Sequence, residues 1–170
     1  RDHIAPEEGI KKSSFAEAIN SRGLEQLLHV YQNLQTNAVA VLPKGHADLG
    51  DLIGIDGSLI DACLSMHWAD YREGSKKAKV HLGFDLNRSI PRKVFLSDGN
   101  GPERPFVSMI LSPGQTGVMD RGYQTHDRFD QWQENGKHFV CRIKAITKKN
   151  LLKNNAIAPD SNIFYDAIAL

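Results

Sequence analysis

The stretch Leu52-Ile53-Gly54-Ile55-Asp56-Gly57-Ser58 decides the fold that we expect for this chain of 170 residues. It is an apolar run of the length of a buried strand, and it leads to an acid, Asp56, followed by a glycine. A second apolar run, Gly117-Val118-Met119, leads in the same way to Asp120, and Arg121 and Gly122 follow. Two strands that each lead to a carboxylate predict a pair of negative charges held close together, as in metal-dependent phosphoryl-transfer sites.

Apolar periodicity predicts two helices at the start of the chain. The first is expected over 15–20, where Ser14 and Glu17 form a capping box. The second is expected from Leu24 to Leu34, because apolar residues recur there every three or four positions and form one stripe. Pro43, Gly45 and Gly50 then indicate a connector.

Short strands and helices are expected after this connector. In chain order they are strands 52–58, 79–86 and 93–96, helix 103–111, strand 116–119, helix 126–134 and strand 138–146. Three strands joined by loops predict an antiparallel meander. Strand, helix, strand, helix, strand is the rhythm of parallel crossovers. The expected fold class is therefore α/β, with a mixed sheet of three antiparallel and two parallel strands and flanking helices.

The two acids are predicted to meet if strand 116–119 pairs with strand 52–58. Asp56 and Asp120 would then share divalent cations such as Mg²⁺, and Arg121 would add charge stabilisation. Gly57 and Gly122 would let a nucleic-acid backbone approach closely. A second interpretation is that Asp56-Gly57 is a tight hairpin turn and Asp120 a salt-bridged loop acid. The further acids Asp61, Asp85 and Asp98 rank lower, because we expect them in exposed register positions or turns.

The charge distribution says more than the net charge of +1. Positive residues cluster after the fifth strand, at Arg142, Lys144, Lys148, Lys149 and Lys153, and before the second strand, at Arg72, Lys76, Lys77 and Lys79. These clusters either contact phosphates or form solvated faces. As candidate DNA-binding residues we single out Arg121, Arg142, Lys144, Lys148, Lys149, Lys76 and Lys77.

Several other classes of protein are disfavoured. No apolar run approaches the roughly eighteen residues of a membrane span, and residues 1–8 lack the order of a signal peptide. Cys63 and Cys141 lie in apolar runs without paired spacing, which predicts reduced core cysteines of a cytosolic protein.

Four segments resemble bacterial insertion-sequence transposases of the DDE class, the family with an IS-four-type catalytic domain. They are LIGIDGSLIDA at 52–62, WADYREGSKKAKVH at 68–81, TGVMDRGYQ at 116–124 and SFAEAINSRGLEQLLHVYQNLQ at 14–35. The resemblance implies a ribonuclease-H-like fold and a Mg²⁺ cofactor, for which Mn²⁺ can substitute. It implies endonucleolytic cutting and joining of double-stranded DNA at transposon ends, by a homodimer in a synaptic complex. It also implies a bacterial cytoplasmic protein associated with the nucleoid when bound to DNA.

The resemblance matches Asp56 with the first catalytic acid of the family and Asp120 with the second. The third, a glutamate in a spaced Tyr, Arg, Glu, Lys signature, has no match: Tyr71-Arg72-Glu73 is contiguous and precedes Asp120, and Glu134 falls on a different helix. We therefore expect a fragment that consists of a helical segment over 1–49, a catalytic core over 50–146 and the start of a strand-rich insertion over 147–170.

Two alternatives to an active catalytic fragment stay open. One is an inactive remnant that acts at most as a DNA-binding or self-associating module. The other is a standalone nuclease of the same fold in which Glu134 or Asp61 supplies the third ligand.

Overall fold

The computed structural model describes residues 11–22, 25–62, 69–72 and 74–169, together with Gly9 and His67. The predictions made for Cys63 and Glu73 lie outside the described residues. The chain begins with helices α1 (Lys12–Arg22) and α2 (Glu25–Val41), and a short 3₁₀ helix, η1 (Ala47–Leu49), leads into the sheet. None of the described helices is long and apolar enough to cross a membrane.

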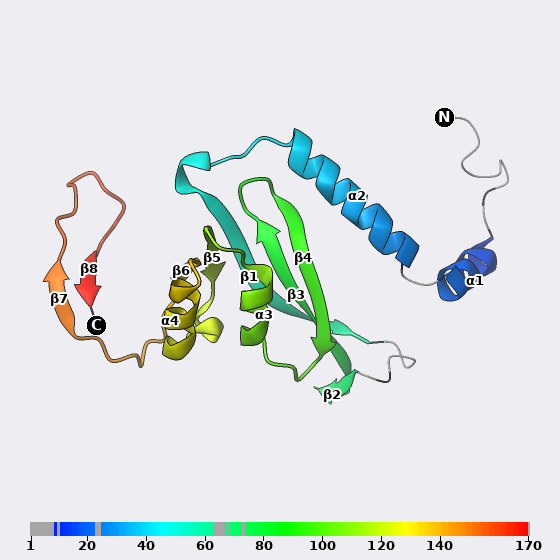
Figure 1. Cartoon of the computed structure of the whole chain (residues 1–170). Coiled ribbons are helices and arrows are strands. Elements are labelled where there is room, and N and C mark those ends of the chain that lie inside the picture. Colours follow the sequence, from blue (N-terminus) through cyan, green and yellow to red (C-terminus); the bar gives the residue numbers. More distant parts are fainter. Residues whose placement is uncertain are drawn as a thin grey trace.

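A mixed sheet forms the centre of the molecule (Figure 1). Its strands are β1 (Asp51–Asp61), β2 (Asp70–Arg72), β3 (Ser75–Asp85), β4 (Ile90–Asp98), β5 (Gln115–Met119) and β6 (His138–Cys141). β3 pairs antiparallel with β1 on one side and with β4 on the other, while β5 and β6 are added to β1 in parallel. The order β4-β3-β1-β5-β6 confirms the predicted mixed sheet and is the ribonuclease-H-like arrangement.

Helices cover one face of this sheet, which we call the closed face. Because side chains alternate along a strand, Ile53 and Ile55 of β1 point to the same side as Met119 of β5. α3 (Arg104–Ile110) and α4 (His126–Glu134) pack there, and Trp132 donates a hydrogen bond to Ser108 Oγ at 3.1 Å. The buried cluster that results comprises Ile53, Ile55, Val107, Ile110, Leu111, Met119, Tyr123 and Trp132.

The opposite face, which we call the open face, carries the alternate residues of the same strands. Several of its apolar side chains are substantially exposed: Ile60 41%, Val94 43%, Leu96 53% and Val140 59%. Asp56 lies on this face, because it alternates with the buried Ile55.

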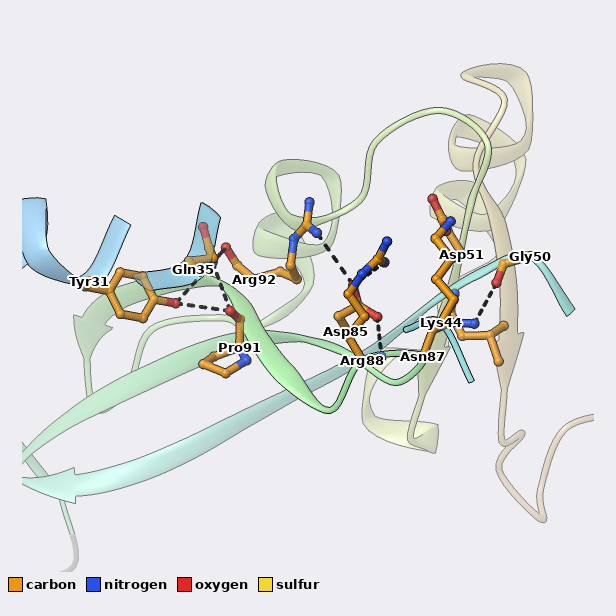
Figure 2. A network of polar contacts seen from close by, with 11 residues as sticks. Tyr31, Gln35, Lys44, Gly50, Asp51, Asp85, Asn87, Arg88, Pro91 and Arg92 are labelled. Carbon is orange, nitrogen blue, oxygen red and sulfur yellow. Dashed lines mark hydrogen bonds and ion pairs between the residues drawn. The ribbon is translucent and has the colours of Figure 1, made fainter. Parts of the chain in front are cut away.

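A polar network joins the connector to the start of β1 and α2 to the start of β4 (Figure 2). The Asn87 side chain donates to the carbonyl oxygens of Gly45, His46 and Gly50 and accepts from Leu52 N. Gln35 of α2 donates to the carbonyl oxygen of Pro91 at 2.9 Å. These bonds fix the chain where it enters β1.

Asp85 belongs to the same network, and our expectation for it was wrong. We expected an exposed strand-end acid, but Asp85 is 4% exposed and is ion-paired with Arg88 at 3.2 Å and Arg92 at 3.5 Å. The reason is its register: Asp85 pairs with Ile53 and therefore faces the closed side, where a carboxylate needs charged partners.

The predicted apolar stripe of α2 meets the sheet only in part. Tyr31 and Gln35 contact β4 through the Pro91 carbonyl oxygen, whereas Leu27, Leu28 and Leu34 are 54%, 48% and 64% exposed.

The last predicted strand is shorter than expected. β6 ends at Cys141 rather than at 146. Arg142 N still donates to Met119 O of β5, but beyond it the backbone is bound by the loop after Asp120, where Lys144 N donates to Gln124 Oε1. Two short strands in polar segments were not predicted, β2 and β7 (Leu151–Asn154). β7 pairs antiparallel with β8 (Ala167–Ala169), and Figure 1 shows this hairpin apart from the main sheet.

Candidate active site

Asp56 and Asp120 follow two residues that pair with each other in the sheet. In the parallel ladder between β1 and β5, Ile55 pairs with Met119; Asp56 follows within β1, and Asp120 follows just after the end of β5. Asp120 keeps an extended backbone, at φ −76° and ψ 166°, so its side chain leaves on the side opposite to Met119. Since Asp56 likewise alternates with Ile55, both carboxylates lie on the open face in neighbouring strands.

The tight-turn interpretation of Asp56-Gly57 is wrong. β1 continues to Asp61, and Gly57 pairs with His81 of β3 in the middle of the ladder. Gly57 also does not offer free space on its closed-face side, since a Cβ there would lie 2.9 Å from Cδ of Glu103. A Cβ on Gly122, in contrast, would meet nothing within 4 Å.

The Asp120 carboxylate is held by its own loop. Its Oδ1 accepts a hydrogen bond from Gly122 N at 2.9 Å, which caps the 3₁₀ helix η2 (Arg121–Tyr123). Cys141 Sγ donates to the Asp120 carbonyl oxygen at 3.3 Å. Burial, and then the negative charge of Asp120, raise the pKa of the Cys141 thiol, and this free cysteine packs against the core cluster.

Tyr123 is a neighbour that the two acids share. Its side chain is buried, at 2% exposure, and burial raises the pKa of its hydroxyl well above the ordinary value. The negative charges of Glu103, Asp56 and Asp120 raise this pKa further. One neutral hydroxyl therefore lies within electrostatic reach of three carboxylates, two of which are the predicted pair.

The donor set suits a hard cation. Mg²⁺ binds through oxygen ligands, commonly one or two carboxylates with water and substrate phosphate completing the octahedron. Asp56 and Asp120 supply carboxylates of this kind on an exposed surface. Within the described part of the chain, no three His, Cys, Asp or Glu side chains come close enough together to hold one metal ion.

Neither alternative third ligand joins the pair. Glu134 is the last residue of α4, which packs on the closed face, whereas the two acids lie on the open face. Asp61 lies at the end of β1 and is ion-paired with Lys77 at 2.6 Å.

Some of the predicted basic residues lie beside Asp120. Arg121 and Lys144 line an open concavity together with Asp120, Gly122, Ala145 and Ile146. Lys144 also lines a second concavity, which Lys148 shares with the start of α4. Gln124 holds this region together, because its Oε1 accepts from Lys144 N at 2.7 Å and its Nε2 donates to Thr147 Oγ1 at 2.9 Å.

The other basic candidates lie elsewhere. Lys76 and Lys77 are near the start of β3, and Lys77 is bound to Asp61. Arg142 and Lys149 are exposed in the segment that follows β6. The structure therefore gathers Arg121, Lys144 and Lys148 near Asp120 but does not bring Lys76 and Lys77 to them.

Two residues near the site were not singled out from the sequence, Lys79 and Glu103. Lys79 Nζ lies 3.2 Å from Glu103 Oε1, and both residues line a third concavity that extends to Gly122. Lys79 was counted only as one charge of a cluster, and Glu103 only as the start of a helix. Their pairing joins β3 to the loop before α3, a contact that no local pattern reveals.

The sequence of the chain matches a known protein family. The sequence profile of the family described as "Transposase DDE domain" matches residues 49–162, which is more than half of the chain. No curated protein matches the sequence. Among solved structures, the cryo-EM structure of the piggyBac transposase synaptic complex with hairpin DNA is similar, with a TM-score of 0.45 and 10% sequence identity.

That alignment covers 81% of this chain and 30% of the piggyBac transposase chain, so the present chain spans less than a third of the length of that protein. The profile match extends from just before β1 to the loop between β7 and β8, and it includes both Asp56 and Asp120. On this match, the chain belongs to the transposase DDE domain family.

Proposed function

We propose that Asp56 and Asp120 together bind a divalent cation, Mg²⁺ or in its place Mn²⁺, in a site that cuts and joins DNA strands. The observation that carries this proposal is the register of β1 and β5, in which Ile55 and Met119, the residues just before the two acids, pair with each other. Membership of the transposase DDE domain family supports the same class of enzyme.

The residues of the chain have distinct roles in this proposal. Asp56 and Asp120 supply the ligand oxygens, and Gly122 N–H fixes the orientation of the Asp120 carboxylate. The bound cation supplies Lewis acidity at a phosphodiester and at the attacking oxygen. Arg121 and Lys144, which line the concavity beside Asp120, attract the phosphate backbone, and Lys148 extends this positive surface.

The wider assignment rests on the sequence motifs. We propose that the parent protein is a bacterial insertion-sequence transposase of the IS-four type that acts on double-stranded DNA in the cytoplasm, as a homodimer at paired transposon ends. In this assignment residues 1–49 precede the catalytic core, 50–146 form it, and 147–170 begin an insertion.

The test is a cleavage and joining assay of the full-length parent protein with a labelled DNA duplex in Mg²⁺ or Mn²⁺. We expect metal-dependent nicking that Asp56→Asn and Asp120→Asn each reduce by at least about a hundredfold, since each removes a ligand of the catalytic cation. Asp130→Asn, at an exposed acid in the middle of α4, is the matched control and should cleave like the wild type. Wild-type rates in the Asp120→Asn variant would refute the assignment.

A second candidate function is DNA binding without cleavage. The observation in its favour is that no third carboxylate joins Asp56 and Asp120 among the residues that the structure describes. It predicts salt-dependent DNA affinity that falls in the double variant Lys144→Ala, Lys148→Ala, with no nicking in either metal.

A further inference from the structure

The loop that carries Asp120 depends on contacts outside the sheet. The β1–β5 ladder ends at the pair Ile55 and Met119, so strand pairing does not fix Asp120 itself. Arg104 of α3 donates from Nε to the Gly122 carbonyl oxygen at 3.2 Å, and Tyr123 is buried in the core cluster. The position of Asp120 is therefore set by what anchors residues 121–123.

Glu103 is the polar partner of Tyr123. The Glu103 carboxylate raises the pKa of the Tyr123 hydroxyl through its charge and a side-chain hydrogen bond, and it lines one concavity with Gly122, the residue before Tyr123. Because Tyr123 belongs to the loop after Asp120 and Glu103 precedes α3, this contact ties the loop to the closed side of β1. The negative charges of Asp56 and Asp120 also raise the pKa of this hydroxyl.

Two features of the sheet fix Glu103 in turn. Lys79 of β3, with a side chain that is 7% exposed, lies 3.2 Å from Glu103 and donates to the Gly101 carbonyl oxygen at 2.9 Å. Gly57, the residue after Asp56, leaves the space that the Glu103 carboxyl group occupies, because a Cβ there would lie 2.9 Å from Cδ. The positive charge of Lys79 offsets the negative charge of Glu103. The Glu103 carboxylate can therefore lie near the two acids with little added repulsion.

We propose that Tyr123 and Glu103 are positioning residues for the candidate metal site. They hold the 120–123 loop against β1 so that the Asp120 carboxylate stays level with that of Asp56. Glu103 acts through Tyr123, from the opposite side of β1, and is not itself a ligand. This inference rests on the proposed function. It also explains why a glycine follows Asp56, because the Glu103 carboxyl group occupies the space that a side chain at position 57 would need.

The test is the Mn²⁺ dissociation constant of the whole 170-residue chain, measured by electron paramagnetic resonance. Tyr123→Phe keeps the buried ring and removes only the hydroxyl, and we expect it to weaken Mn²⁺ binding about tenfold, the usual order for residues that orient metal ligands. Gly57→Ala displaces Glu103 without altering any carboxylate and should weaken binding in the same direction. Tyr165→Phe, at a tyrosine that is 68% exposed, is the control and should bind like the wild type.

The outcomes separate this inference from the proposed function. If Asp120→Asn abolishes Mn²⁺ binding while a folded Tyr123→Phe variant binds like the wild type, the positioning role is refuted and the metal site stands. If Asp120→Asn itself binds Mn²⁺ normally, the proposed function fails. Should Tyr123→Phe unfold, the comparison is made with Glu103→Gln, and unchanged affinity there overturns the inference.

Discussion

The closed and open faces of the sheet are built from alternate residues of the same strands, yet they differ in how far their side chains are buried. On β1, Ile53 and Ile55 are 3% and 4% exposed and pack under α3 and α4. Their neighbour Asp56 and the more distant Ile60, on the open face, are both exposed. Stability is thus concentrated on one side of each strand and the candidate chemistry on the other.

This difference shows how a short strand holds a charged site without losing its fold. A carboxylate at Asp56 costs little solvation, because water reaches the open face. Its position is nevertheless fixed, because the flanking residue Ile55 is locked in the core. The predictions that follow test whether the two faces really divide in this way.

The largest expected effect is the loss of a side chain that fills the closed face. Trp132 is 2% exposed and contacts Phe129 and Phe139 through its ring, so Trp132→Ala should lower the free energy of unfolding by about 3–5 kcal/mol. Leu96→Ala on the open face should cost about 1 kcal/mol or less, because Leu96 is already 53% exposed. Urea denaturation of both variants measures the contrast, and equal costs would show that the faces are not different.

A glycine pair gives a smaller but cleaner contrast. A Cβ on Gly83 would lie 2.4 Å from Cγ2 of the buried Ile110, so Gly83→Ala should destabilise the fold by about 1–3 kcal/mol through overpacking. A Cβ on Gly54 would meet Leu86 at 3.3 Å, and Leu86 is 39% exposed and free to move. Gly54→Ala should therefore be close to neutral in thermal unfolding, and a cost equal to that of Gly83→Ala would argue against an open face.

The smallest effect concerns pH, through the buried His81. His81 stacks on Phe106 with ring centroids 3.7 Å apart, and burial, followed by the charge of Lys79, lowers its pKa below the ordinary 6.5. The unfolded chain then binds a proton more readily than the folded chain does. Stability is therefore complete above about pH 6.5 and falls as the pH drops below that value.

His81→Phe provides the check on this pH dependence. The variant loses the hydrogen bond to Ser97 and should be less stable at every pH, but its stability should change less between about pH 7.5 and about pH 5.5. Urea denaturation at the two values measures the slope. An unchanged slope would mean that other groups control the acid sensitivity.

The sequence predicted the order of the strands because their apolar runs are short and bounded by turns. The pairing of β5 with β1 followed from topology, and in it the residues just before Asp56 and Asp120, Ile55 and Met119, pair with each other. The sequence did not reveal the true extent of β1, because Asp56-Gly57 is equally typical of a turn and only the paired β3 shows that the strand continues.

The supporting contacts of the site could not be predicted in the same way. Lys79 lies in β3, Glu103 in the loop before α3 and Tyr123 in η2, and no pattern within one of these segments shows that they lie near one another. The burial of Asp85 was missed for the same reason, since its partners Arg88 and Arg92 lie beyond a turn that had to be known first. The alternation of side chains along a strand can be read from neighbouring residues in the sequence. The partner of a buried charge depends on the tertiary structure.

The most direct test of the central claim is Mn²⁺ binding by the intact chain with a double-mutant cycle at the two acids. If Asp56 and Asp120 share one cation, Asp56→Asn and Asp120→Asn should each weaken Mn²⁺ binding by at least about tenfold, and the double variant should bind little more weakly than the weaker single variant. The shared site on the open face would be contradicted if the losses in Mn²⁺ binding free energy of the two single variants simply added in the double variant. It would also be contradicted if the single variants bound Mn²⁺ like the wild type.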